Sequence, residues 1–211
     1  MKTTVKNNLS RYGILPTIDL IRRLPEIAHW LQAGCTGSAP PPVKRMALSA
    51  YRRRYKLTQF IETGTHLGDT LAYMAQQQNV QASSIELDDA YYLAAKQRFA
   101  SYANVTLLHG DSGECLPELV QHLQSPALFW LDGHYSGEDT GKGALDTPVS
   151  AELESILKSP IKGHVILIDD ARCFDSTHDY PHLDILLERV RRNNTHHIEV
   201  SADIIRLTPK D

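Results

Sequence analysis

Three aspartates follow two apolar segments that are expected to be neighbouring strands. Asp132 comes directly after residues 127–131, and Asp169 with Asp170 comes directly after residues 165–168. Three carboxylates placed together repel one another unless they are protonated, kept apart or neutralised by a cation. Oxygen ligands of this kind suit Mg²⁺ or a similar hard divalent cation, with water and substrate oxygens completing the coordination. The pattern therefore predicts a metal site at Asp132, Asp169 and Asp170.

The same carboxylates have an alternative interpretation that needs no metal. Asp170 would cap the turn at Ala171, and Arg172 would neutralise the aspartate pair as an ordinary ion pair. The sequence leaves both interpretations open.

His134 is the residue best placed to act as a base. It lies two residues beyond Asp132, and a histidine has an unperturbed pKa of about 6.5, which suits proton removal near neutral pH. We expect Asp132 and His134 to be the catalytic residues. The alternative is a histidine that only fixes its own glycine-rich loop, residues 133–145, which would either close over a substrate or lie on the surface.

A turn rich in small and polar residues follows the first expected strand. Gly64 and Gly68 in this turn would let the backbone pass close to a ligand at the start of a helix. Glu86 ends the next strand, 22 residues beyond Gly64, where an acid can bridge the two hydroxyls of a ribose. The spacing Gly-x-x-x-Gly differs from the Gly-x-Gly-x-x-Gly of dinucleotide-binding domains. These residues predict a nucleoside site, and an exposed acid at a strand end is the alternative for Glu86.

The elements that position these residues alternate between strand and helix after about Leu57. Two short strands at the end are joined by only Ser201-Ala202-Asp203, and so short a link requires an antiparallel pair. We therefore predict a twisted α/β sheet that is parallel except at one strand, with helices on both faces and ligands at the carboxyl ends of the strands. The expected strands lie at 60–61, 83–87, 105–109, 127–131, 165–168, 197–200 and 204–207.

The segment from Phe60 to Thr70, followed by Ile85-Glu86, resembles the class I S-adenosylmethionine-dependent methyltransferases, and the resemblance extends over roughly residues 57–207. It implies a three-layer α/β/α Rossmann-like methyltransferase sheet of seven strands, the last antiparallel, and S-adenosyl-L-methionine as cofactor. The turn has one glycine fewer than the fullest motif of the family. By resemblance, the turn lines the methionine end of the cofactor, Glu86 holds its ribose and Asp111-Ser112 lie by its adenine. The cofactor-binding residues so implied are Glu62, Gly64, Thr65, His66, Gly68, Thr70, Glu86, Asp111, Ser112 and Asp132.

The three aspartates are similar to the metal site of the catechol-type and macrolide-sugar O-methyltransferases. Those enzymes place an acid after the fourth strand and an Asp-Asp or Asp-Asn pair after the fifth, and the Asp-Asp of this chain matches the sugar enzymes more closely. The resemblance implies O-methylation of a small hydroxylated, sugar-like metabolite, assisted by a divalent cation. The Asn/Asp-Pro-Pro-aromatic motif of amino-base methyltransferases does not occur after the fourth strand, where the chain reads Leu131-Asp132-Gly133-His134-Tyr135.

The N-terminal quarter of the chain differs from the rest in charge. Residues 1–57 contain eleven Lys/Arg and two acids, whereas the remaining 154 residues contain eleven Lys/Arg and twenty-three acids. Apolar residues at helical spacing predict helices at about 17–31, interrupted at Pro25, and at 43–55. We predict a basic helical N-terminal extension or lid, residues 1–56, that docks on an acidic methyltransferase domain, residues 57–211. Contact between its basic residues and RNA phosphates is possible but less favoured.

Composition excludes several classes of protein. A chain of 211 residues that is 42% hydrophobic and 22% charged can bury a core, which excludes wholesale disorder. No apolar run approaches the ~20 residues of a membrane-spanning helix, so no membrane partner is expected. Three isolated cysteines and a start without an apolar signal core favour a cytoplasmic protein.

Two other functions stay open on the sequence alone. One is an RNA-directed methyltransferase, or a cofactor-binding subunit, that uses the basic N-terminus. The other is an NAD-dependent oxidoreductase, against which the glycine spacing and the final hairpin count. The oligomeric state is undecided, with a homodimer among the options.

Overall fold

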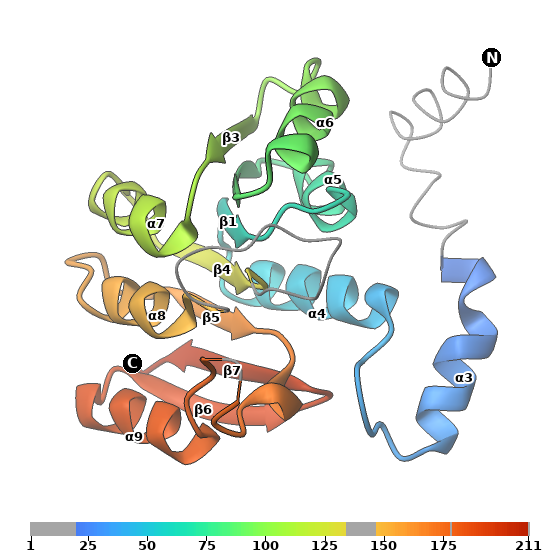
Figure 1. The fold of residues 1–211 in the computed structure, drawn as a ribbon, viewed down its shortest axis with the longest axis vertical. Coiled ribbons are helices and arrows are strands. Elements are labelled where there is room, and N and C mark those ends of the chain that lie inside the picture. The colour runs from blue at the N-terminus through green and yellow to red at the C-terminus, as the bar shows by residue number, and fades with distance from the viewer. Residues whose placement is uncertain (1–19, 134–146, 178, 211) are drawn as a thin grey trace.

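The computed structural model describes residues 20–133, 147–177 and 179–210, which form one seven-stranded sheet with helices on both sides (Figure 1). The strand order is β3-β2-β1-β4-β5-β7-β6. Neighbouring strands are parallel except where β7 pairs with β5 and with β6, so the predicted antiparallel strand is confirmed. The strands are β1 (Gln59–Thr63), β2 (Gln81–Glu86), β3 (Val105–His109), β4 (Ala127–Leu131), β5 (Val165–Ile168), β6 (His196–Ser201) and β7 (Ile204–Pro209).

Chain order in the sheet reverses between β1 and β4. From β1 the chain proceeds outward to β2 and β3, and it then returns to place β4 on the other side of β1. In open α/β sheets ligands bind at such a point, outside the carboxyl ends of the strands. The pairing of Thr63 with Leu131 sets the ends of β1 and β4 level there, and the residues that follow both strands meet.

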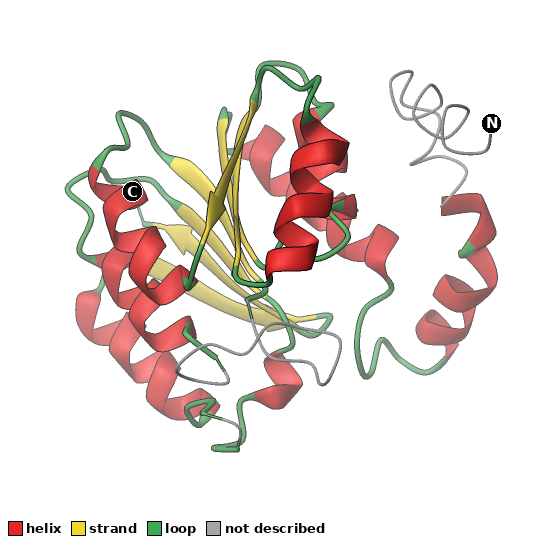
Figure 2. Cartoon of the chain, turned by 45° about the horizontal axis from the view of Figure 1, so that its top comes forward, coloured by secondary structure: helices red, strands yellow, loops and turns green. Residues whose placement is uncertain are grey.

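Helices cover both faces of the sheet (Figure 2). Side chains of a strand point alternately to its two faces, and β4 shows this clearly: Phe129 and Leu131 join one buried cluster, whereas Leu128 and Trp130 join the other. Leu48, fully buried, lies in the second cluster, so α4 is part of the layer that covers this face. The helices are α3 (Leu24–Gln32), α4 (Pro41–Arg54), α5 (Asp69–Ala75), α6 (Asp89–Phe99), α7 (Ser112–Gln121), α8 (Val149–Leu157) and α9 (Leu183–Asn193), with a 3-10 turn η1 (Ala171–Cys173).

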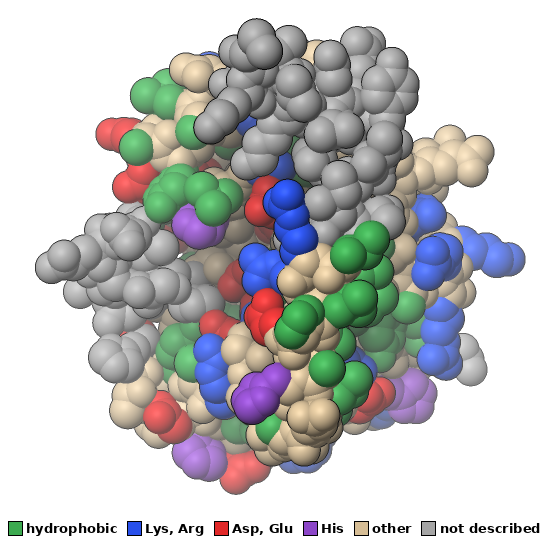
Figure 3. Space-filling view, turned by 90° about the vertical axis from the view of Figure 1, so that its right-hand side faces the viewer, with side chains coloured by type: hydrophobic (Ala, Val, Ile, Leu, Met, Phe, Trp, Pro, Cys, Tyr) green, Lys and Arg blue, Asp and Glu red, His purple; other side chains and the backbone are tan. Residues whose placement is uncertain are grey.

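Helix α3 is the first of the two N-terminal helices in the described part of the chain. Helix α3 begins at Leu24 with Pro25 in its first turn, in agreement with the interruption predicted there, and in Figure 1 it lies apart from the sheet at the right, connected to α4 by a loop. Ile21, Leu24 and Leu31 are exposed large hydrophobic residues in or next to this helix, and Figure 3 shows hydrophobic side chains gathered on the side of the molecule that lies at the right of Figure 1. None of the helices in the described part of the chain combines the length and hydrophobicity needed to cross a bilayer.

Candidate active site at the carboxyl edge of the sheet

The turn after β1 presses closely against the backbone that leaves β4. Gly64 has φ +83°, and a Cβ at this position would lie 2.5 Å from the carbonyl oxygen of Asp132. Gly68 also has a positive φ, +74°, and precedes α5 as its N-cap. Glycine is required at Gly64 for both its conformation and its close approach. The turn after β1 is therefore held directly against the backbone at Asp132, and a side chain at Gly64 would push the two segments apart.

Glu62 lies beneath this turn, at the end of β1. Its side chain is buried and accepts a hydrogen bond of 2.9 Å from the Ser84 hydroxyl, which is itself 2.6 Å from the hydroxyl of Thr65. Burial raises the pKa of Glu62 to about 8, against the effect of the hydrogen bond from Ser84 and with help from the charge of Glu86. At neutral pH the Glu62 carboxyl is thus mostly uncharged, and a cationic ligand nearby would favour its ionised form.

Glu86 joins the ends of β1 and β2. Only 6% of the residue is exposed, so the alternative of an exposed strand-end acid is wrong. One of its carboxylate oxygens accepts a hydrogen bond of 2.7 Å from the backbone N–H of His66, and the other accepts one of 2.9 Å from the backbone N–H of Asp88. The His66 ring meets the Tyr91 ring edge-on, with centroids 4.7 Å apart. These contacts hold the carboxylate in a fixed position at the carboxyl edge of the sheet.

The chain after β3 contributes a second polar group. The buried Ser112 hydroxyl donates a hydrogen bond of 2.6 Å to the carboxylate of Glu152 in α8. A Cβ on Gly133 would lie 3.2 Å from the same hydroxyl. Asp111 is the N-cap of α7, and its side chain accepts a hydrogen bond of 2.8 Å from the backbone N–H of Gly113. Ser112 therefore borders the segment that leaves β4, whereas Asp111 secures the start of its helix. Thr70 lies in the first turn of α5.

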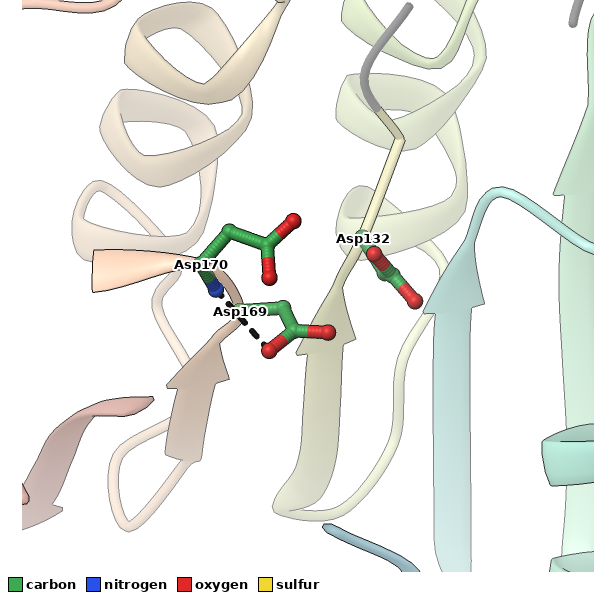
Figure 4. Close-up of side chains that lie close together, drawn as sticks. All are labelled: Asp132, Asp169 and Asp170. Atoms are coloured by element: carbon green, nitrogen blue, oxygen red, sulfur yellow. Dashed lines mark hydrogen bonds between the residues drawn. The ribbon is translucent and has the colours of Figure 1, made fainter. Parts of the chain in front are cut away.

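The three aspartates come together at the ends of β4 and β5 (Figure 4). Asp132, Asp169 and Asp170 each offer a carboxylate oxygen, and these oxygens lie within 4.8 Å of one another. Asp169 and Asp170 are buried. Asp170 adopts the left-handed conformation, φ +55°, and its backbone N–H donates a hydrogen bond of 2.8 Å to Oδ1 of Asp169. We call these residues the aspartate cluster. Its oxygen-only donor set fits a hard divalent cation.

Two cationic side chains also reach the aspartate cluster. Lys44 of α4 places its Nζ 2.5 Å from Asp169 Oδ2 and 3.5 Å from Asp170 Oδ1. Arg172 lies 2.8 Å from Asp170 and also pairs with Asp203. The ion pair with Arg172 that the sequence left open is present. Asp170 is the N-cap residue of the turn at Ala171, as that alternative proposed, but its side chain makes no capping hydrogen bond there.

Charge and burial act in opposite directions on the pair of Lys44 and Asp169. Burial raises the pKa of Asp169, the Lys44 ammonium opposes this, and the neighbouring Asp170 adds to it. Burial lowers the pKa of Lys44, but Asp169 and Asp170 outweigh it and the net change is upward. The direct contact between the ammonium and the carboxylate favours the charged form of both groups.

The structure also contains site residues that sequence reasoning did not assign. Ser84 and Lys44 give no local signal, and Lys44 is 125 residues from Asp169. Glu152 does give one, because this acid lies among the apolar positions Val149, Leu153 and Ile156 on the buried face of α8. The predicted base, His134, lies outside the described residues.

Comparison with known proteins defines the fold. No protein-family model and no curated protein matches the sequence. Among solved structures, the O-methyltransferase TomG from Streptomyces achromogenes is 18% identical, with a TM-score of 0.55 and 81% of each chain covered. An O-methyltransferase from Bacillus cereus is 15% identical, with a TM-score of 0.61 and 91% of this chain and 90% of that chain covered. The 23S rRNA methyltransferase ErmE is 14% identical, with a TM-score of 0.51 and coverage of 82% and 70%. The chain shares the Rossmann-like fold of these methyltransferase structures, which is the fold that the resemblance implied.

Proposed function

We propose that this protein is an S-adenosylmethionine-dependent methyltransferase that methylates a hydroxyl group of a small, sugar-like metabolite. The single observation that carries the proposal is the buried Glu86 carboxylate, fixed beside the glycine turn of β1 at the point where strand order reverses. The fold shared with TomG and with the Bacillus cereus enzyme, both O-methyltransferases solved with SAM or SAH, supports it.

The residues of the turn provide what a nucleoside with a cationic amino-acid end requires. Gly64 lets the turn after β1 lie against the backbone at Asp132, and Glu86 can accept hydrogen bonds from two ribose hydroxyls. Glu62 offers a carboxyl group that a bound cation would ionise. Ser112 and the backbone of Gly133 border the neighbouring space. When bound, the donor supplies a methyl group that the acceptor oxygen attacks, while the electron pair of the breaking carbon–sulfur bond stays on sulfur.

An alcohol acceptor must also lose a proton, because its pKa lies far above neutrality. Asp132 lies at the mouth of the site next to Gly64, and His134 remains our proposed base from the sequence. We propose that Asp132, Asp169 and Asp170 can hold Mg²⁺ or a similar ion, which would act as a Lewis acid on the acceptor oxygen. The oxygen donors within 4.8 Å of one another support this assignment.

Binding of S-adenosylhomocysteine to Glu86→Gln tests the proposal. Glutamine keeps the shape of the side chain but removes the charge and one strong acceptor, so we expect binding at least about tenfold weaker by isothermal titration calorimetry. Glu118→Gln, which changes an exposed acid on α7, is the matched control and should bind like the parent. Absence of binding by the parent protein, or equal binding by both variants, would contradict the proposal.

The acceptor is tested separately, by assaying methyl transfer to a panel of sugars and other small hydroxyl compounds. Activity that disappears with a chelator and with Asp169→Asn would support both the oxygen acceptor and the metal. Activity on RNA alone would overturn the small-molecule assignment. Two basic residues of the N-terminal extension, Lys44 and Arg52, already bind the body of the protein through Asp169 and Gln77, and this favours the small acceptor.

A further inference from the structure

We propose that Lys44 is a built-in counter-ion of the aspartate cluster, and that a divalent cation binds there only when it displaces the Lys44 ammonium. Lys44 would then set the affinity of the cluster for metal ions. The inference rests on the proposed function only in assigning the cluster to the acceptor side of the site. Its test measures metal binding, which does not depend on the methyl donor.

The position of the Lys44 nitrogen is the first support. Its distance of 2.5 Å from Asp169 Oδ2 is close to the metal–oxygen distances of about 2.0–2.6 Å found for Mg²⁺ and Ca²⁺. The same nitrogen is 3.5 Å from Asp170 Oδ1, so it faces two of the three carboxylates. An ammonium and a divalent ion cannot share this space, because they would repel each other at contact distance.

The packing of α4 is the second support, because it fixes the point from which Lys44 reaches the cluster. Leu48, one helical turn further on, is fully buried. Ser49 Oγ and Arg52 Nε each donate a hydrogen bond of 3.0 Å to the side-chain oxygen of Gln77. The helix is therefore anchored to the body beyond Lys44. The Lys44 side chain, 16% exposed, has a flexible four-carbon stem and can leave the cluster without movement of the helix.

The charges at the cluster explain why a second cation remains attractive. Three carboxylates meet one ammonium and one guanidinium, and Arg172 is shared with Asp203. Without Lys44, the negative charge around Asp169 is compensated less well. Removal of the ammonium should therefore open a coordination position and strengthen the attraction for a divalent ion at the same time.

Titration of Mn²⁺ against the full-length protein, followed by electron paramagnetic resonance of the free ion, tests the inference. Lys44→Met removes the charge but keeps the length of the stem, so we expect its Mn²⁺ affinity to be at least about tenfold higher than that of the parent. Arg53→Met is the matched control, because it removes a charge from an exposed position of the same helix. Its affinity should stay within about twofold of the parent. Adding Asp169→Asn to Lys44→Met should abolish the gain.

Several outcomes would overturn the inference. These are unchanged or weaker Mn²⁺ binding by Lys44→Met, no binding by either protein, or an equal gain from Arg53→Met, which would indicate a general charge effect. Lys44→Gln serves as a second variant if the methionine protein does not fold, as judged by circular dichroism, and the same tenfold gain is expected. If the parent protein does not bind S-adenosylhomocysteine, the proposed function would be contradicted. The difference in Mn²⁺ affinity between Lys44→Met and the parent would still stand.

Discussion

Replacing Gly64 by alanine tests whether the turn after β1 is held against the backbone that leaves β4. The new Cβ would lie 2.5 Å from the Asp132 carbonyl oxygen, in a residue with φ +83°. The left-handed conformation alone costs a residue with a Cβ about 1–2 kcal/mol. Relief of the clash requires backbone to move, because a carbonyl oxygen cannot rotate away as a side chain does, and overpacking of this kind adds about 1–3 kcal/mol. We therefore expect Gly64→Ala to lower the free energy of unfolding by about 2–5 kcal/mol.

Gly163→Ala is the matched control for this experiment. Gly163 has nearly the same φ, +88°, but the nearest atom to its added Cβ is the side-chain Cγ of Pro126 at 3.3 Å. Because Pro126 needs to shift by only a few tenths of an ångström, this variant should lose mainly the conformational part, about 1–2 kcal/mol, or roughly 2–8 °C in melting temperature for a domain of this size. Gly64→Ala should lower the melting temperature more and should also weaken S-adenosylhomocysteine binding. Equal losses of stability in the two variants would refute the close approach of Gly64 to Asp132.

Two further predictions concern buried titratable groups. Burial, together with the charges of His196 and Lys162, lowers the pKa of His164 to about 4. Its neutral form therefore contributes stability that is complete above about pH 6.5 and is lost as the pH falls toward 4, by up to about 3 kcal/mol. Urea unfolding from pH 7.5 to 4.5 measures this loss of stability. If His164→Asn showed the same pH dependence as the parent protein, the assignment to His164 would be contradicted. For Glu62, whose pKa is raised to about 8 mainly by burial, binding of the cationic cofactor should release a proton at pH 7, so that affinity rises between pH 6 and 8. Calorimetry in two buffers of different ionisation enthalpy detects the proton, and a release that persists in Glu62→Gln would rule out Glu62 as its source.

Most of the sheet was predictable because its signals are local. The bounds of β3, β4 and β5 match the apolar segments at 105–109, 127–131 and 165–168, since a run of apolar residues bounded by polar ones leaves a buried strand few alternatives. The final hairpin follows from the length of its link, because three residues cannot carry a chain back to a parallel partner. The predicted antiparallel strand is confirmed for the same reason.

The candidate site was predictable in part. The rule that ligands gather at the carboxyl ends of strands selected Gly64, Glu86 and the aspartates, and the structure brings these residues to one edge of the sheet. Charge compensation was visible only for Arg172, which is two residues from Asp170. The role of Glu86 as a buried carboxylate was undecided on the sequence, because burial depends on the turn that covers it.

The sequence by itself determined which segments form strands, where the polar residues follow them, and hence which edge of the sheet is the candidate site. These properties depend on hydrophobic periodicity and short connections, which act between near neighbours in the chain. Only the tertiary structure decided that Lys44 contacts Asp169 across 125 residues, that Glu62 is buried enough to shift its pKa, and that Gly64 meets Asp132. Such contacts arise when packed layers bring distant segments together, and no local spacing specifies them.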